Sequence, residues 1–213
     1  MKIEIWSDVM CPFCYIGKRR LEGALASFPH KDEVEIVWKS FQLNPDMRTE
    51  PGKSITDYLV EKKGWSREQI HQMHERLTLS AKEMGLHYDF DKAVVANSFD
   101  AHRLVQLAKT RGLGDAMEER LFKAYFSEGG NIADPATLIK LGLDAGLAEA
   151  DIRSVLEGEA FAKEVRGDVE EARQLGVNGV PFFVLDRKYA VSGAQETPAF
   201  LKALEKAYGE SKL

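Results

Sequence analysis

The sequence is poor in cysteine, lacks long apolar runs and has no excess of positive charge. Its 213 residues include two cysteines and carry a net charge of −5. An acidic chain has no basic field to attract a phosphate backbone, so we expect no nucleic-acid partner. No apolar stretch approaches the roughly 20 residues that a membrane-spanning helix needs, so we expect no membrane partner either.

The N-terminus lacks the marks of a secretory signal. Residues 1–6 alternate apolar and polar side chains, which predicts a strand, and no long apolar region or small-residue cleavage site follows. We therefore expect a cytoplasmic protein. The last three residues, Ser211-Lys212-Leu213, match a peroxisomal address that applies only in a eukaryote, and we favour a polar tail without signalling function instead.

The order of the predicted elements indicates an α/β fold. Hydrophobic residues make up 44% of the chain and charged residues 30%, which is ordinary for a soluble globular protein. Alternating patterns predict strands at residues 2–7 and 34–41, and helical spacing predicts a helix at about 11–27 between them. A strand–helix–strand unit of this length implies a parallel pair of strands with a right-handed crossover.

The middle of the chain is predicted to be helical. From about residue 54 to 175 one amphipathic stretch follows another, with no convincing strand between them. A strand pattern returns near residue 181 as a predicted hairpin, ahead of a terminal helix. Because strands lie on both sides of the helical block, we expect one domain, residues 1–45 and 159–213, into which residues 46–158 are inserted.

The two cysteines form a Cys-x-x-Cys pair at the start of a predicted helix. Thiol–disulfide exchange needs a thiolate nucleophile and a second thiol that resolves the mixed disulfide. Residues three apart are neighbours in a helical turn, so Cys11 and Cys14 are placed for these two roles. Unpaired N–H groups at the helix N-terminus stabilise negative sulfur at Cys11. We therefore predict that Cys11 attacks and that Cys14, deeper in the helix, resolves.

Other interpretations of the pair have less support. A structural zinc site usually needs four ligands, and neither another cysteine nor a histidine at ligand-like spacing accompanies the pair, so we expect no metal. A structural disulfide closing so short a loop would be unusual in a reducing cytosol. Among the histidines, we expect His71 and His74 on a solvated helix face, and His102 as a packing residue.

Six segments carry a recognisable pattern that extends along nearly the whole chain. They are residues 7–19, 41–45, 101–104, 124–126, 176–183 and 191–195. Their most specific parts are Cys-Pro-Phe-Cys, the late Gly-Val-Pro-Phe and Ser-Gly-Ala-Gln. Together they resemble the DsbA family of thiol–disulfide oxidoreductases, in particular its FrnE-like cytosolic branch. The resemblance implies a thioredoxin-like fold with an inserted all-helical domain, in agreement with the predicted elements.

The resemblance also implies roles for individual residues. The family's nucleophile corresponds to Cys11 and its resolving thiol to Cys14. Its cis-proline, which faces the disulfide and holds extended substrate, corresponds to Pro181, and the backbone of Val180 would pair with substrate. We therefore expect an enzyme that exchanges disulfides with a disulfide-containing protein or with glutathione and that needs no cofactor.

The two residues between the cysteines are expected to tune the reduction potential. Periplasmic members of the family carry a histidine where this chain has Phe13, next to Pro12. An imidazolium helps to stabilise the thiolate and a phenyl ring cannot, so we expect a milder oxidant. Some FrnE-like proteins have further cysteines near the C-terminus, and their absence here excludes a relay to a second internal pair. Some relatives form dimers, which leaves a homodimer open.

Two alternative functions remain. The chain also resembles kappa-class glutathione transferases and 2-hydroxychromene-2-carboxylate isomerases, which share the fold but typically have serine at the position of Cys11. In that case the loop Gly193-Ala194-Gln195, ahead of the terminal helix, would bind a carboxylate of glutathione. The second alternative is a non-enzymatic, chaperone-like binding module with inert cysteines and an exposed apolar patch.

Overall fold

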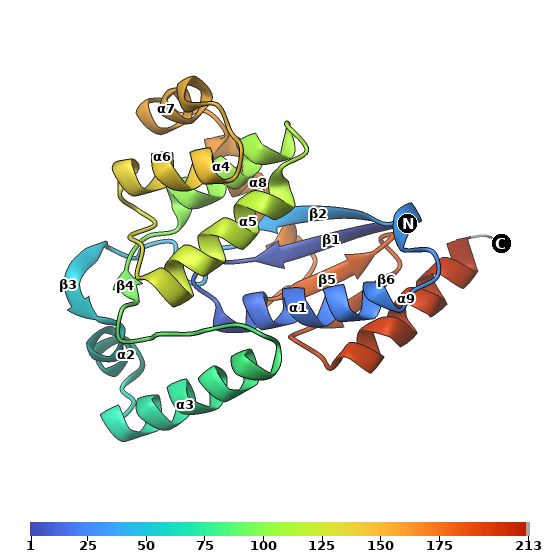
Figure 1. The fold of residues 1–213 in the computed structure, drawn as a ribbon, viewed down its shortest axis with the longest axis horizontal. Helices are drawn as coiled ribbons and strands as arrows, with labels where there is room; N and C mark the ends of the chain where they lie inside the picture. Colours follow the sequence, from blue (N-terminus) through green and yellow to red (C-terminus); the bar gives the residue numbers. More distant parts are fainter. Residues whose placement is uncertain (212–213) are drawn as a thin grey trace.

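The computed structural model describes residues 1–211, and its centre is a four-stranded sheet (Figure 1). β1 pairs with β2 in parallel, as predicted, while β5 joins β1, and β6 joins β5, in antiparallel register. The C-terminal tripeptide that matches a peroxisomal address lies largely outside the described residues. In spatial order the strands are β2 (Glu35–Ser40), β1 (Lys2–Ser7), β5 (Phe182–Leu185) and β6 (Tyr189–Ser192).

Helices make up most of the remaining described chain. In Figure 1, α1 and α9 run along the sheet and pack against each other, whereas α4 to α7 form a group of their own. The helices are α1 (Pro12–Ala26), α2 (Ile55–Lys63), α3 (Arg67–Glu83), α4 (Phe99–Lys109), α5 (Gly114–Lys123), α6 (Pro135–Asp144), α7 (Glu149–Glu157), α8 (Ala162–Gln174) and α9 (Thr197–Ser211). A 3₁₀ turn, Lys31–Glu33, and a π-helical turn, Ala124–Glu128, complete the set.

Local chemistry fixes where several of these helices begin. Ser66 accepts a hydrogen bond from the backbone of Gln69, and the Gln69 side chain accepts one from the backbone of Ser66, forming a capping box at the start of α3. Asp134 caps α6, because its side chain accepts a hydrogen bond from the backbone of Thr137. Pro135 occupies the first helical position, where a missing N–H costs nothing. These starts are readable from the sequence because they depend on neighbouring residues only.

The alternation of β1 separates two apolar layers. Ile3 and Ile5 belong to the cluster that also contains α1 and α9 residues. Trp6 lies on the opposite face, where its indole N–H donates a hydrogen bond of 2.9 Å to the carbonyl of Asp168 in α8. Because successive side chains of a strand point to opposite faces, one face of the sheet meets α1 and α9 and the other meets α8.

The inserted block contains two short strands that the sequence analysis missed. β3 (Glu50–Ser54) pairs with β4 (Val94–Val95) in an antiparallel sheet of irregular register. The prediction of uninterrupted helical segments from residue 54 to 175 is therefore wrong at β4. Two residues are too few for a period-two pattern, and the pairing depends on a partner some forty residues away. The boundaries of the insertion stay a prediction.

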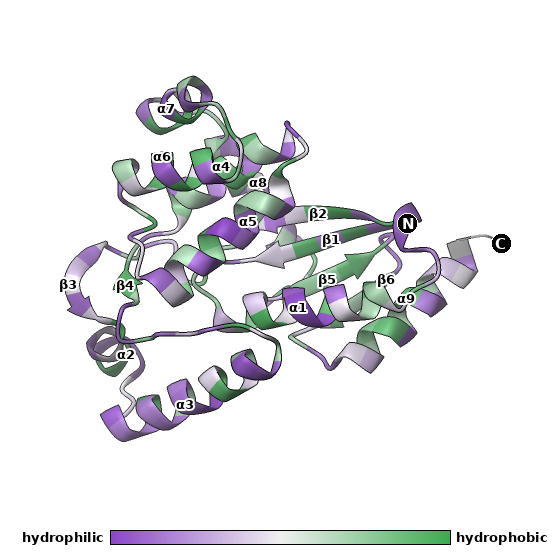
Figure 2. Ribbon diagram, in the orientation of Figure 1, coloured by the Kyte–Doolittle hydropathy of each residue, from purple (hydrophilic) through white to green (hydrophobic). Residues whose placement is uncertain are grey.

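The insertion and the sheet share one hydrophobic core. Figure 2 shows apolar residues concentrated in the strands of the central sheet, whereas β3 and most of α3 are polar. A single buried cluster contains Ile5 of β1, Tyr15 of α1, Leu104 of α4 and Phe122 of α5. Tyr15 and Phe122 stack with their ring centroids 4.9 Å apart. The helical block is therefore packed directly against the helix that carries the cysteines.

Candidate active site

Cys11 and Cys14 lie in the first turn of α1, where the sequence predicted them. Cys11 is the N-cap residue, Pro12 is the first helical residue, and the amide of Cys14 donates a hydrogen bond of 3.0 Å to the Cys11 carbonyl. Both thiols are free, and they are 4% and 1% exposed, respectively. Cys11, the predicted nucleophile, is thus the more accessible of the two.

The loop before β5 brings Val180 and Pro181 against this turn. The peptide bond between them is cis, the isomer that the resemblance implied. The Cys11 thiol donates a hydrogen bond to the Val180 carbonyl, with 3.4 Å between Sγ and oxygen. Pro181 also approaches α1 closely, since a Cβ added at Gly17 would lie 3.0 Å from the Pro181 Cγ. The fold therefore joins the predicted nucleophile, the predicted proline and the predicted substrate-pairing backbone in one place.

An apolar hollow of about 330 Å³ opens beside Cys11. Phe13, Leu43 and Trp65 line it, although each of these large apolar side chains is between 41% and 51% exposed. Such gathering of exposed apolar surface marks a binding site more often than a solvated face. The further lining residues include Met10, Ile55, Leu59, Met73, Leu77, Phe90, Tyr125 and Val180. No lysine or arginine of residues 1–211 lines this hollow.

His74 also lines the hollow, which corrects the prediction of a solvated position. Its side chain is buried, with 8% exposure, and its ring stacks on Phe90 at 4.1 Å between centroids. Burial lowers the pKa of its imidazole. His71, one turn away, is exposed as predicted. The segment around Phe90 follows α3 in the chain and folds back over His74. The helical pattern of α3 alone does not reveal this position of the segment.

A buried polar cluster lies on the inner side of the cysteine pair. Ser7, Asp8, His102 and Glu118 are each at most 1% exposed. The Ser7 hydroxyl donates a hydrogen bond of 2.9 Å to Glu118 Oε1, and His102 Nε2 lies 3.4 Å from Asp8 Oδ1. The Ser7 side chain also favours the ionised Cys14 thiol and so acts to lower its pKa, against the larger effect of burial. His102 is thus a packing residue with a satisfied polar contact, as predicted, but it belongs to a cluster that lies beside Cys14.

Burial and neighbouring charges shift the pKa values in this cluster. Burial raises the pKa of Glu118 to about 7, although His102 and Ser7 act in the opposite direction. Burial disfavours the His102 cation, but hydrogen bonding and charge from Asp8 outweigh it and raise the pKa of that imidazole. Burial, followed by the contact with Cys11, raises the pKa of the Cys14 thiol. Cys14 therefore retains its proton at neutral pH, while Glu118 titrates there.

The sequence analysis did not single out Ser7 or Glu118. A signal for Glu118 exists in the helical pattern of α5. Gly114, Met117 and Leu121 are buried at helical spacing, and Glu118 falls on the same face. A carboxylate on the apolar face of an amphipathic helix is unusual, because burying a charge without partners is costly. The helical pattern alone therefore distinguishes Glu118 from the other acids of α5.

The predicted glutathione loop lies next to Pro181, but its polar groups already have partners. The Gly193 amide donates a hydrogen bond of 2.9 Å to the Pro181 carbonyl. The Ala194 carbonyl accepts one from Arg20, and the Gln195 side chain donates one of 2.8 Å to a carbonyl of the preceding strand. The loop therefore belongs to the neighbourhood of the site, and its carboxylate-binding role stays a prediction.

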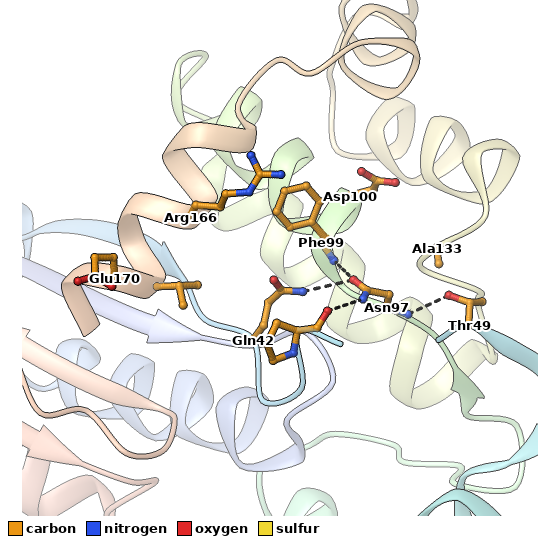
Figure 3. A pocket seen from close by; sticks show the side chains of 10 residues that line it. Gln42, Thr49, Asn97, Phe99, Asp100, Ala133, Arg166 and Glu170 are labelled. Atoms are coloured by element: carbon orange, nitrogen blue, oxygen red, sulfur yellow. Dashed lines mark hydrogen bonds between the residues drawn. The ribbon is translucent and has the colours of Figure 1, made fainter. Parts of the chain in front are cut away.

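A larger hollow, of about 650 Å³, shares no lining residue with the one beside Cys11. Figure 3 shows Asn97 at its centre, with hydrogen bonds to Gln42, to the backbone of Phe99 and to Thr49. Arg166 lies over the Phe99 ring, 5.3 Å from its centroid. These contacts explain how the loop after β2 is held against α4, and no cysteine takes part in them.

The described residues contain neither a metal cluster nor a candidate membrane span. Within residues 1–211, no three or more His, Cys, Asp or Glu side chains are grouped so that they could hold a metal ion. No helix in that range combines the length and apolar character needed to cross a bilayer.

Comparison with known proteins assigns the chain to a family. A family model described as a DSBA-like thioredoxin domain matches residues 2–205. The chain belongs to the DsbA-like thioredoxin family. A probable DsbA oxidoreductase from Streptomyces coelicolor is 43% identical, and its structure superposes with a TM-score of 0.93 over 99% of this chain and 91% of that one. The fold class predicted from the sequence, a thioredoxin-like α/β fold with a helical insertion, is thereby confirmed.

Two more distant structures share the fold of this DsbA-like chain. A 2-hydroxychromene-2-carboxylate isomerase is 16% identical, with a TM-score of 0.70 over 99% of this chain and 95% of that one. A cytosolic disulfide reductase, DsbM from Pseudomonas aeruginosa, solved with glutathione, is 20% identical, with a TM-score of 0.68 over the full length of both chains. At these identities the likeness concerns the fold alone.

Proposed function

We propose that this protein is a cytosolic thiol–disulfide oxidoreductase in which Cys11 attacks and Cys14 resolves. One observation carries the proposal: the Cys11 thiol, the less buried of the two, bonds to the Val180 carbonyl at the edge of an apolar hollow, and Cys14 lies deeper in the same turn. In the first step the Cys11 thiolate attacks a substrate disulfide, and one substrate thiolate leaves. In the second step Cys14 attacks the Cys11 sulfur and releases the other thiolate, so the protein pair is oxidised and the substrate reduced.

The shape and chemistry of the hollow favour a protein disulfide over a small one. A volume of about 330 Å³ beside Cys11 accommodates a bulky apolar side chain next to the reacting cysteine of a partner. Glutathione carries two carboxylates and no such side chain. Lys62 and Lys63 line an adjoining hollow that shares Leu43 with this one and could pair with those carboxylates, so glutathione stays a secondary substrate or reductant.

The residues around the pair supply the remaining parts of the proposed mechanism. Pro181 shapes the wall facing the thiol, and the Val180 backbone pairs with an extended substrate. Pro12 fixes the first turn, and the half-exposed Phe13 presents an apolar ring to the partner. Without a charge at Phe13 to stabilise the thiolate, the potential is expected to be that of a mild oxidant or a reductant.

A redox titration tests the proposal directly. The protein is equilibrated in graded mixtures of reduced and oxidised glutathione, alkylated at low pH and weighed by mass spectrometry. A single two-electron transition between the two cysteines is expected, and its midpoint gives the direction of electron flow. Identical alkylation of both thiols in every mixture would refute the proposal and favour a non-enzymatic binding module.

Single substitutions separate the two thiols. Cys11→Ser should abolish exchange, because no other thiol reaches the Val180 carbonyl and the hollow. Cys14→Ser should leave the first step intact and accumulate mixed disulfides on Cys11, detectable by mass. Full turnover in Cys11→Ser, or an absence of trapped species in Cys14→Ser, would contradict the assigned roles.

A glutathione-dependent isomerase or transferase is the second candidate, since the fold likeness to the isomerase extends over 99% of the chain. It predicts saturable glutathione binding and an activity that survives the loss of Cys14. The cysteine at position 11 counts against it, because this chemistry needs only a hydroxyl to orient the glutathione thiol. Calorimetric titration of Cys14→Ser with reduced glutathione distinguishes the two candidates.

A further inference from the structure

The apolar hollow beside Cys11 continues into a second hollow of about 360 Å³. The side chains that line both are Met10, Leu43, Ile55, Leu59 and Tyr125. Because the two hollows have this wall in common, a peptide that is held beside Cys11 and fills the first hollow extends into the second. The second hollow, unlike the first, is also lined by lysines.

Helix α2 forms one side of both hollows and sets their length. Ile55 and Leu59 line both, whereas Tyr58 and Lys62 line the second alone. These four residues recur at helical spacing and therefore lie on one face of the helix. From Ile55 to Lys62 an α-helix rises about 10 Å, which equals about three residues of an extended peptide. A peptide whose cysteine meets Cys11 therefore reaches Lys62 within a few residues.

The second hollow is positively charged in a protein whose net charge is −5. Lys62 and Lys63 line it, and no aspartate or glutamate of residues 1–211 lines either hollow. Both lysines are exposed, and neither forms an ion pair within that range, whereas Lys53 nearby is paired with Glu50 and Glu61. Two cations without a facing anion create a local field that attracts a negative group.

Two tyrosine hydroxyls add hydrogen-bond donors to the same hollow. Tyr125 is 3% exposed and Tyr58 is 7% exposed. The Tyr58 hydroxyl accepts a hydrogen bond of 2.7 Å from Asn44 and donates its own proton to no acceptor among residues 1–211. The Tyr125 hydroxyl has no hydrogen-bond partner in the same range. A buried hydroxyl without an acceptor is costly, so both are suited to an oxygen atom of a bound partner.

We propose that the second hollow binds an acidic side chain of the partner protein, so that the preferred disulfides have an apolar residue beside the cysteine and an aspartate or glutamate about three to five residues away. This inference rests on the proposed oxidoreductase function and names the class of partner that it serves. The carboxylate pairs with Lys62 and Lys63, and the tyrosine hydroxyls donate to oxygen atoms of the bound peptide. The apolar side chain fills the first hollow, which leaves the cysteine at Cys11.

A series of activated peptides tests this preference. Each peptide carries one cysteine as a mixed disulfide with thionitrobenzoate, a phenylalanine beside it, and an aspartate, asparagine or lysine at one position between about two and about six residues away on either side. Attack by Cys11 on the peptide sulfur releases the coloured thiolate. Each second-order rate constant is divided by that of the same peptide with dithiothreitol, which removes differences in intrinsic reactivity.

The aspartate peptide should react about fivefold faster than the asparagine peptide, and the lysine peptide about fivefold slower, at positions about three to five residues from the cysteine. The difference should shrink as salt is added, because the lysines are exposed. Non-specific attraction to a protein of net charge −5 gives the opposite order, so it does not mimic this result.

Paired substitutions locate the preference. Lys62→Gln with Lys63→Gln should reduce the advantage of aspartate over asparagine to below about 1.5-fold, and Lys62→Glu with Lys63→Glu should make the lysine peptide the fastest. The matched control is Lys82→Gln with Lys163→Gln, which removes the same charge from two exposed lysines that line neither hollow and should keep the wild-type order.

The outcomes separate this inference from the proposed function. Equal normalised rates for the aspartate and lysine peptides in wild type would overturn it, and so would a preference that Lys62→Gln with Lys63→Gln leaves intact. If the paired variants do not fold, a wild-type preference that is the same at every position or insensitive to salt overturns it as well. A paired glutamine variant that slows only the reduction of oxidised glutathione would assign the second hollow to glutathione. A reduced wild-type protein that releases no thiolate from any peptide would instead refute the oxidoreductase function itself.

Discussion

The raised pKa of Glu118 makes a quantitative prediction about stability that does not depend on catalysis. In the unfolded chain its carboxyl has the ordinary value of 4.5, and in the fold burial raises the pKa to about 7. Between these values the folded state holds a proton that the unfolded state has lost, so stability falls as the pH rises through this window and is constant above it. At ~1.4 kcal/mol per tenfold change in affinity, the ionised carboxylate costs the fold about 3 kcal/mol at pH 8.

Glu118→Gln removes this titration and keeps the shape of the side chain. Relative to wild type, its free energy of unfolding should therefore gain about 3 kcal/mol between about pH 4.5 and about pH 8. Urea denaturation at several pH values, followed by tryptophan fluorescence, measures this difference without assumptions about function. The difference in unfolding free energy between the two proteins at any single pH does not matter here, because only the change of this difference with pH reports the ionisation of Glu118.

Glu119→Gln provides the opposite case on the same helix. Burial disfavours ionised Glu119, but hydrogen bonds from Arg19 and Tyr15 outweigh it and lower its pKa to about 2. Its contribution is present above the unfolded value of 4.5 and is lost only as the pH falls toward 2, so it is constant between about pH 5 and about pH 8. An offset for Glu118→Gln as flat as that of Glu119→Gln would refute the assignment of a buried, titrating carboxyl.

Three further predictions concern packing and substrate choice. Gly17→Ala places a Cβ 3.0 Å from the Pro181 Cγ and should lower the free energy of unfolding in urea by ~1–3 kcal/mol. Gly23→Ala, on the exposed side of the same helix, should raise it by up to ~1 kcal/mol. Equal effects of the two substitutions would refute the close contact. Trp65→Ala should reduce kcat/KM about tenfold for a peptide disulfide with a phenylalanine beside its cysteine, but not for oxidised glutathione; parallel losses would show that the hollow does not select apolar partners. Arg103→Met removes the side-chain donor to the carbonyls of Val155 and Gly158 at the end of α7 and should cost about 3 kcal/mol in the same denaturation assay; a loss below about 1 kcal/mol would contradict that role.

The elements that local chemistry determines could be predicted from the sequence. β1 follows from the alternation of apolar and polar residues up to Ile5, the capped helices from Ser66 and Asp134, and the cysteine turn from two cysteines with a proline between them. The two-residue strand β4 could not be predicted, because its partner is distant and its length carries no period.

The candidate site likewise contains residues that the sequence predicted and residues that it did not. The predicted trio of Cys11, Cys14 and Pro181 does meet in space, since the turn and the late strand each carry a local signature. Glu118 was missed because its significance lies in the contact with Ser7, which joins the insertion to β1 across 111 positions of sequence. Contacts of that kind depend on how the helical block docks, and no pattern within a single segment encodes them.

The antiparallel pairing of β1 with β5 has a consequence for the protein during its synthesis on the ribosome. Ile3 lies opposite Leu185, and the Val180 carbonyl follows Cys11 by 169 residues. At about 5–20 residues per second, the ribosome delivers that carbonyl roughly 10–30 s after the cysteine. Throughout this interval the nascent chain presents both thiols without the strand, the proline or the carbonyl that later surround them. The nascent form of the molecule is therefore an ordinary dithiol, open to the redox conditions of its compartment, and the proposed selectivity requires that the chain be made at least as far as Pro181.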